Sequence, residues 1–185
     1  AIDLAEDPAF PMTRAEALAT VADFLLDPPT ATNPDAPDDP DHVVLASGLA
    51  ASPGRVVGRL CTEIDDAIAA GAKGESIVLV RRETSPADIA GIAEAAALVT
   101  TLGGLVSHAA VVARSWGLPA VVGVSDVVVE PGGIVAAGRR VTSGELLTVD
   151  GDRGVVLLGD HPAEEIEVDE VRILRRWQRE LTARP

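Results

Sequence analysis

The chain has very few aromatic residues and a single cysteine. Aromatics make up 2% of its 185 residues, with two Phe, two Trp and no Tyr. A surface that stacks nucleic-acid bases needs aromatic side chains, and a sequence-independent nucleic-acid site needs a basic surface. The formal net charge here is −14, so we expect no nucleic-acid partner. The lone Cys61 excludes an internal disulfide and a zinc site built from several cysteines.

Long apolar runs and targeting signals are also missing. No stretch of about 18 or more apolar residues is present, so we expect no membrane span. The chain does not open on a basic segment followed by an apolar one, so no signal peptide is visible and a cytoplasmic location is expected. The glycine patterns G-x-G-x-x-G and G-x-x-x-x-G-K-[ST] do not occur either, which leaves a nucleotide site of those kinds unsupported.

Most of the negative charge lies at the start of the chain. Residues 1–42 hold ten acidic side chains and one basic side chain, a net charge of −9. Residues 43–159 hold twelve acidic and nine basic side chains, a net charge of −3. Residues 27–42 contain five Pro and six Asp or Asn, a composition typical of an extended, solvated linker. We therefore expect an N-terminal helix and acidic linker over 1–42, a body over 43–160 and a C-terminal segment over 161–185.

Both flanking segments carry helical patterns. Thr13 and Glu16 have capping-box spacing at the start of a short helix that the Pro-rich segment ends. Over 163–182, four apolar residues have helical spacing. Four Arg lie mostly off this stripe and acidic residues are close by, which favours a solvated packing helix over a phosphate-binding one. The apolar stripe consists of Val171, Leu174, Trp177 and Leu181.

The body alternates apolar runs of strand length with helical segments, and then changes to short β segments with glycine turns. Such an order predicts an α/β fold with a mixed sheet, followed by hairpins from residue 127 to 159. The expected strands lie at about 43–52, 55–61, 76–82, 96–101 and 118–124, and the expected helices at about 65–71, 86–94 and 107–116.

His108 is the residue whose surroundings point to chemistry. Gly103 and Gly104 permit a tight turn and close approach by a bulky group, and Ser107 is suited to cap the helix that follows. His108 then takes the first helical position, where free N–H groups and the helix dipole favour an anion. The same field disfavours a protonated ring, which keeps the imidazole neutral and nucleophilic. The residues thus suit a histidine that accepts a phosphoryl group.

The chemistry of these residues alone leaves other functions possible. A histidine near a helix start is often a hydrogen-bonded surface residue. A metal site is disfavoured because no second His or Cys lies within helical reach of His108, and a Ser107 nucleophile is disfavoured because the G-x-S-x-G elbow is missing. The remaining histidines, His42 and His161, are expected to be exposed and without a role.

Three blocks of the sequence, taken together, resemble a known family. They are T-x-x-G-G-x-x-S-H-A-A-V-V-A-R followed by G-L-P-A-V-V-G (100–123), G-L-A-A-S-P-G (48–54) and L-V-R-R-E-T-S-P-A-D-I (79–89). They are similar to the mobile phosphohistidine domain of phosphoenolpyruvate-utilising enzymes, and the last block is most similar to pyruvate, phosphate dikinase. The resemblance covers about 43–159 and implies a swivelling β/β/α domain.

The resemblance also implies a function. In that family the histidine carries a phosphoryl or pyrophosphoryl group from an ATP-grasp domain, where Mg²⁺-bound ATP is the donor, to a TIM barrel, where pyruvate becomes phosphoenolpyruvate. Neither partner domain is recognisable in these 185 residues, so the chain is expected to be the carrier alone, meeting its partners in cis or in trans and binding no metal or cofactor itself. By position, the implied carrier is His108, with Thr100 orienting the ring, Gly103 and Gly104 clearing space, Ser107 capping the helix and Arg114 a candidate phosphate contact.

The sequence departs from that family at two positions, and two other functions stay open. Position 102 is Leu, where dikinases often have a polar or charged residue, and position 106 is Val, where plant-type dikinases have a phosphorylatable Thr. The alternatives are the His-carrier domain of a small-molecule phosphotransferase of the antibiotic type, and a non-catalytic interaction domain that has the same fold.

Overall fold

A computed structural model of the chain describes residues 2, 12–22, 25, 30–32, 43–162 and 165–182. The chain divides into two compact units, of which one comprises 1–36 with 164–185 and the other comprises 37–163. Each unit has hydrophobic clusters of its own, and each is described by itself below.

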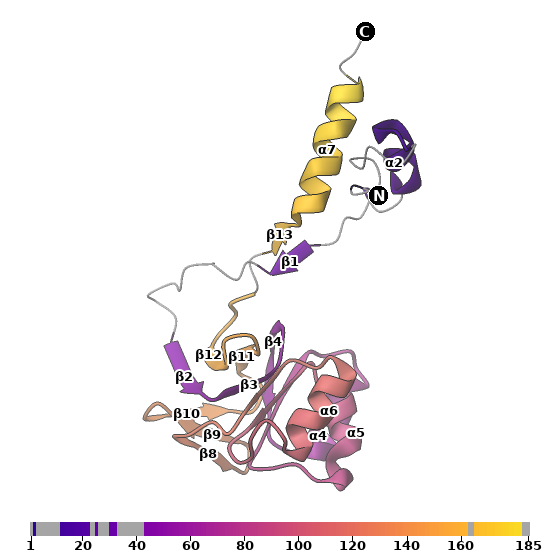
Figure 1. Cartoon of the computed structure of the whole chain (residues 1–185). Coiled ribbons are helices and arrows are strands. Elements are labelled where there is room, and N and C mark those ends of the chain that lie inside the picture. The colour runs from indigo at the N-terminus through magenta and orange to yellow at the C-terminus, as the bar shows by residue number, and fades with distance from the viewer. Residues whose placement is uncertain are drawn as a thin grey trace. The chain divides into compact units, whose positions relative to one another are not determined.

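A mixed sheet of eight strands forms the centre of the larger unit, which we call the body (Figure 1). Its strands are β2 (Val43–Ser47), β3 (Leu49–Ser52), β4 (Arg55–Cys61), β5 (Ile77–Arg81), β6 (Ala97–Thr100), β7 (Ala120–Val122), β11 (Leu146–Asp150) and β12 (Val155–Leu158). The spatial order is β2-β12-β11-β4-β5-β6-β7-β3. The four strands β4 to β7 run parallel, and the other pairings are antiparallel.

Helices connect the parallel strands and cover one face of this sheet (Figure 1). They are α4 (Ile64–Gly71), the 3₁₀ turn η1 (Pro86–Asp88), α5 (Ile89–Ala93) and α6 (His108–Trp116). Because successive crossovers are right-handed and step in the same direction, all of them lie on the same face. Ile77 and Leu79 of β5 point into this layer and are fully buried with Ile92 and Ala110.

A second, three-stranded antiparallel sheet covers the opposite face. Its strands are β8 (Val127–Glu130), β9 (Gly133–Ala136) and β10 (Arg139–Thr142), in the order β10-β9-β8. Ile134 and Val141 are buried in one cluster with Val78 and Val80, the residues of β5 that alternate with the helix-facing pair. Since β5 is covered on both faces, its run of apolar residues has no polar alternation. The body is therefore a β/β/α arrangement of three layers, and the predicted α/β class and mixed sheet are confirmed.

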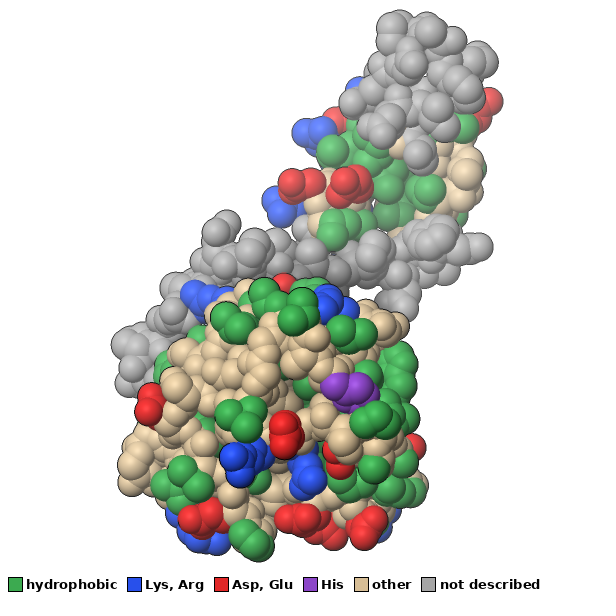
Figure 2. Space-filling model, turned by 60° about the horizontal axis from the view of Figure 1, so that its bottom comes forward, with side chains coloured by type: hydrophobic (Ala, Val, Ile, Leu, Met, Phe, Trp, Pro, Cys, Tyr) green, Lys and Arg blue, Asp and Glu red, His purple; other side chains and the backbone are tan. Residues whose placement is uncertain are grey.

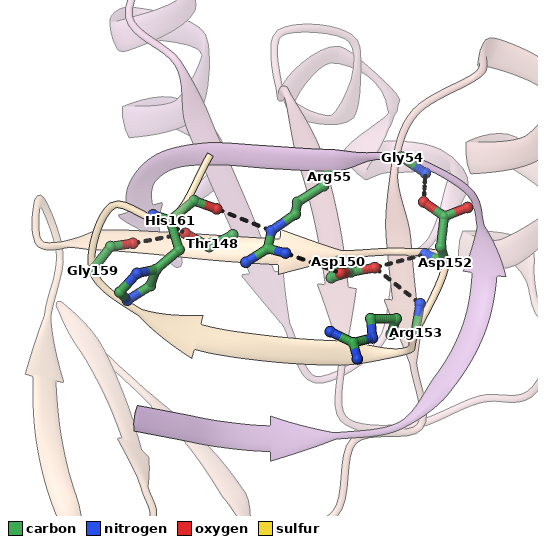
Figure 3. Close-up of polar contacts among 8 residues, drawn as sticks. All are labelled: Gly54, Arg55, Thr148, Asp150, Asp152, Arg153, Gly159 and His161. Carbon is green, nitrogen blue, oxygen red and sulfur yellow. Dashed lines mark hydrogen bonds and ion pairs between the residues drawn. The ribbon is translucent and has the colours of Figure 1, made fainter. Parts of the chain in front are cut away.

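A buried ion pair holds the point at which the chain leaves the body (Figure 3). Arg55 Nη1 lies 3.7 Å from Asp150 Oδ2, and the two side chains are only 10% and 6% exposed. Asp150 Oδ1 also accepts hydrogen bonds from the backbone N–H groups of Asp152 (3.1 Å) and Arg153 (2.9 Å). Arg55 Nε donates to the carbonyl of His161 at 2.9 Å. The network thus fixes the exit of the chain against the first residue of β4.

The expectation that His161 is an exposed histidine is wrong. Its ring Nε2 lies 2.8 Å from the carbonyl oxygen of Leu158, and its backbone N–H donates to Thr148 Oγ1 at 2.9 Å. The side chain is half-buried because the chain turns back against β11 and β12 before it leaves the body. His42, for which the same expectation was made, lies outside the described residues.

Two helices of the smaller unit contribute to one apolar cluster. They are α2 (Arg14–Thr20) and α7 (Asp169–Thr182). The predicted capping box is confirmed, since Thr13 Oγ1 accepts from the N–H of Glu16 while the Glu16 carboxylate accepts from the N–H of Thr13. Trp177 is buried with Ala17, and the guanidinium of Arg14 lies 4.8 Å from the centre of its ring.

Two expectations for this unit need correction. Residues 30–32, placed in the unpaired linker, form strand β1 (Thr30–Thr32), which pairs antiparallel with β13 (Glu165–Glu167). The C-terminal helix begins at Asp169 rather than 163, because Glu165 to Val168 alternate polar and β-branched residues and favour a strand. Leu181 is exposed, unlike the other residues of the predicted stripe. The rest of 27–42 lies outside the described residues.

No helix within the described parts of the chain is long and apolar enough to cross a membrane.

Candidate functional site

The site is built where two neighbouring parallel strands end. Arg81, the last residue of β5, is paired in register with Thr100, the last residue of β6. The segments that follow these strands therefore leave the sheet at the same edge. One carries Thr84, and the other makes a glycine turn and enters α6 at His108.

Ser107 caps helix α6 as predicted. Its hydroxyl accepts from the N–H of Ala110 at 3.4 Å, and its backbone is extended, with φ −67° and ψ 161° in the range of an N-cap. His108 is therefore the first helical residue, at the end of the helix where unpaired N–H groups and the helix dipole favour negative charge.

The two glycines of the turn have different functions. Gly103 has φ +102°, and a Cβ there would lie 2.9 Å from Cβ of Ser107, so the turn itself requires glycine. A Cβ on Gly104 would meet no atom within 4 Å. The space beside Gly104 is thus open, whereas Gly103 is close to Ser107, and the expectation that both glycines clear space next to His108 stays a prediction.

The surface around this turn is apolar. Val106, two residues before His108, is 92% exposed, and the side chains of Leu102, Leu105 and Val111 are also exposed. Over the face of the body visible in Figure 2, acidic and basic side chains are intermixed rather than gathered into a region of one sign. The exposed side chains of this turn therefore present hydrocarbon, and the N-terminus of the helix adds positive potential beside them.

The His108 ring is held by a residue that the sequence analysis did not select. Thr84 Oγ1 lies 3.2 Å from Nδ1 of His108, a hydrogen bond in which either atom can be the donor. Because Nδ1 is engaged, Nε2 is the ring nitrogen left to react.

Thr100 does not contact the ring, which corrects the expectation that it orients His108. Thr100 is completely buried, and its hydroxyl donates to the carbonyl of Leu102 at 2.8 Å. Its backbone carbonyl accepts from Val124 at 3.0 Å. Thr100 therefore shapes the start of the glycine turn, whereas Thr84 makes the contact assigned to it.

Arg114 donates hydrogen bonds to two backbone carbonyls, and the expectation that it contacts phosphate stays a prediction. Its Nη2 donates to the carbonyl of Leu105 at 2.7 Å and its Nη1 donates to the carbonyl of Ala51 at 3.1 Å. One guanidinium thus ties the turn before His108 to the edge strand β3.

A signal for Thr84 was present in the sequence. It lies in the block L-V-R-R-E-T-S-P-A-D-I, between a buried strand and a Ser-Pro helix start. Polar residues that follow adjacent parallel strands meet at one edge of a sheet, but the neighbouring position of β5 and β6 had to be known first.

Within the described residues, no group of three or more His, Cys, Asp or Glu side chains is arranged to hold a metal ion. The single cysteine, Cys61, is buried at the end of β4 and its Sγ lies 3.2 Å from the carbonyl of Glu63. Burial raises the pKa of this thiol, so it is protonated at neutral pH and unsuited to act as a nucleophile.

Comparison with known proteins agrees with this geometry. Residues 73–154 match the family described as PEP-utilising enzyme, mobile domain. The chain is 38% identical over 173 residues to pyruvate, phosphate dikinase of Rhizobium meliloti (strain 1021), a match that covers 91% of this chain and 18% of that protein. It is 43% identical over 130 residues to pyruvate, phosphate dikinase 2 of Oryza sativa subsp. japonica, covering 69% of this chain and 15% of that protein.

Solved structures give a weaker match. An NMR solution structure of Enzyme I (nEIt) is 26% identical with a TM-score of 0.35, and covers 58% of this chain and 38% of that one.

The chain spans less than a fifth of the length of these two dikinases. The matched region includes His108, the Thr84 segment and the parallel strands β5 to β7 that bring them together. Residues 73–154 therefore belong to the mobile-domain family of phosphoenolpyruvate-utilising enzymes, and this chain is similar in sequence to pyruvate, phosphate dikinases.

Proposed function

We propose that this chain carries a phosphoryl or pyrophosphoryl group on His108, as the mobile domain of a pyruvate, phosphate dikinase-type enzyme. The proposal rests on the surroundings of the His108 ring. His108 lies at the first position of a capped helix, Thr84 engages its Nδ1, and the space beside Gly104 is open. A structural histidine needs neither the open space nor a place at the start of a helix.

The hydrogen bond to Thr84 sets which nitrogen reacts. When Nδ1 carries the proton and donates to Thr84 Oγ1, Nε2 has a free lone pair. A phosphoryl group that arrives at Nε2 then meets a neutral nucleophile beside the N-terminus of α6, where the dipole stabilises the negative charge of the transferred group.

The chemistry balances without any other group on this chain. The Nε2 lone pair attacks the β-phosphorus of ATP, an N–P bond forms, and the bond to the oxygen bridging to the α-phosphate breaks, so that AMP leaves with that electron pair. Inorganic phosphate then takes the outer phosphoryl group as pyrophosphate. Finally the enolate oxygen of pyruvate attacks the remaining phosphorus and the N–P bond breaks. Because Nδ1 keeps its proton, the ring leaves as neutral imidazole.

The nucleotide, Mg²⁺ and pyruvate sites belong, in this proposal, to partner domains of the ATP-grasp and TIM-barrel kinds, in cis or in trans. A carrier that visits two such sites needs a mobile connection. We assign that role to residues 33–42, the part of the acidic segment that follows strand β1, because its composition favours an extended chain. Protection of its backbone amides from hydrogen exchange throughout turnover of the full-length protein would contradict this assignment.

Label transfer tests the proposal. The chain is mixed with the nucleotide-binding portion of a pyruvate, phosphate dikinase, Mg²⁺ and ATP labelled at the β-phosphate. The expected result is one acid-labile, base-stable label per chain, retained in His42→Ala and lost in His108→Ala. Equal labelling of His108→Ala and the parent chain would contradict the proposal. Subsequent addition of a pyruvate-binding portion and pyruvate should move the label to phosphoenolpyruvate.

A further inference from the structure

Thr84 reaches His108 from a short segment that belongs to neither a strand nor a helix. The segment runs from Arg82 to Ser85, between β5 and η1. None of its four residues belongs to either apolar cluster of the body. A 3.2 Å contact from such a segment therefore depends on whatever holds its two ends.

The first end is tied to the turn that leads to His108. The carbonyl of Arg81 accepts from the N–H of Thr101 at 3.1 Å, and the carbonyl of Arg82 accepts from the N–H of Leu102 at 2.7 Å. These bonds extend the pairing of β5 and β6 by two residues beyond the sheet edge, so the two segments leave the sheet together.

The second end is held by Asp88. Its Oδ2 accepts from the backbone N–H of Ser85 at 2.7 Å and from the Ser85 hydroxyl at 3.0 Å, which forms the capping box of η1. The residue fixed in this way directly follows Thr84.

One side chain joins both ends. Arg81 Nη2 lies 3.7 Å from Asp88 Oδ1, the carboxylate oxygen that the cap leaves free, while Arg81 Nη1 donates to the carbonyl of Thr62 at 2.7 Å. The Arg81 and Asp88 side chains are 28% and 14% exposed. The pair is thus largely removed from water, where charge-assisted contacts are stronger than on the surface. Glu63 is the other carboxylate near this guanidinium, at 3.9 Å.

Stability alone does not account for an arginine at this position. Its Nε is buried and has no hydrogen-bond partner among the described atoms, and an unpaired buried donor is unfavourable. An apolar residue at position 81 would continue the apolar sequence of β5 without burying an unpaired N–H group. Local departures from packing rules of this kind are expected near functional sites.

We infer that Arg81 and Asp88 are positioning residues that hold the Thr84 hydroxyl at Nδ1 of His108, and so present Nε2 to the phosphoryl donor. The inference rests on the proposed function of His108, but the geometry it describes has a readout that needs no phosphoryl transfer. Without the ion pair, the 82–85 segment moves away, Nδ1 loses its partner, and the ring returns to the tautomer mixture of free imidazole, in which Nε2 carries the proton more often.

The first test is the tautomer of His108, read from the side-chain ¹⁵N shifts of the whole chain with His108→Ala to assign them. We expect the Nδ1–H form to dominate in the parent protein, and to fall in Arg81→Gln and in Asp88→Asn, which loses the charge but can still cap Ser85. The matched control is Arg59→Gln. Arg59 also holds a backbone carbonyl (Gly144) and a glutamate (Glu75), but it has no link to Thr84. Unchanged His108 signals in Arg81→Gln would overturn the inference.

The second test is a double-mutant cycle on the rate of His108 phosphorylation by phosphoramidate, a donor that needs no partner domain. Arg81→Gln and Thr84→Val are each expected to slow the reaction by about tenfold, because a misplaced reactive group costs rate steeply. Arg81→Gln/Thr84→Val should be no slower than Thr84→Val alone. Additive effects, or an equal loss in Arg59→Gln, would refute the positioning role. Absence of any His108 labelling in the parent chain would refute the proposed function while leaving the tautomer result to stand.

Discussion

At the residue scale, the site depends on which atoms occupy the space around one imidazole. Thr84 takes Nδ1, while the Cβ position of Gly104 is empty. Gly103, one residue earlier, is required by its own backbone, with φ +102°. Gly103 is therefore required by the fold, whereas a requirement for glycine at position 104 would come from the proposed reaction.

This separation gives a first prediction. Gly103→Ala should lower the free energy of unfolding by about 1–3 kcal/mol, because a side chain is strained at that φ. Gly104→Ala should unfold as the parent chain does, yet accept phosphoryl groups from the protein donor more slowly, because the new methyl group stands where the donor approaches. Thermal unfolding and label transfer measure the two effects. Equal transfer by Gly104→Ala would show that the donor approaches from elsewhere.

The thiol of Cys61 gives a second prediction. Burial raises its pKa, and its Sγ is directed at the carbonyl of Glu63. Iodoacetamide at pH 8 should therefore label the folded chain very slowly and the unfolded chain fully. As this is the only cysteine, intact mass reports the reaction without background. Rapid labelling of the folded chain would show that the end of β4 opens.

At the scale of elements, caps and turns were predictable because they depend on residues close in sequence. The Ser107 cap, the Thr13–Glu16 capping box and strand β4 are found where the sequence placed them. The contact between Thr84 and His108 could not be predicted, because it depends on β5 and β6 being parallel neighbours in one register. The pairing of β1 with β13 was missed for the same reason, since about 135 residues separate its partners.

The turn before β11 gives a prediction about pH. The N–H and hydroxyl of Thr142 both donate to Glu145, and these bonds lower the pKa of its carboxyl. A carboxyl with a lower pKa in the folded state stabilises the fold above its unfolded value, and that contribution is lost as the pH falls through the folded value. Glu145→Gln should thus melt below the parent at pH 7, and the difference should shrink as the pH falls below the ordinary pKa range of a glutamate. A difference that grows on acidification would contradict this sign.

At the scale of the whole molecule, the two units have separate cores. The body is stabilised by the clusters on the two faces of its main sheet, whereas the smaller unit depends on Trp177 with Ala17 and Leu174. The net charge follows the same division, since residues 43–159 carry −3 of the −14. In the proposed function, the histidine would move together with the whole body, because the body has a core of its own.

Independence of the units gives a further prediction. Trp177→Ala should cost the smaller unit about 3–5 kcal/mol, the range for a large aromatic removed from a core. Hydrogen exchange should then show loss of protection in α7 and unchanged protection in β5. A parallel loss in β5 would show that the two units unfold together.

The most direct measurement of the central claim is the site of phosphorylation at atomic detail. The chain, labelled with ¹⁵N in its histidines, is phosphorylated and examined for coupling between phosphorus and nitrogen. The geometry of His108 predicts one phosphorus, coupled to Nε2 of that residue, with Nδ1 still protonated and shielded by Thr84. A phosphorus coupled to Nδ1 of His108, or bound to any other residue, would contradict the account.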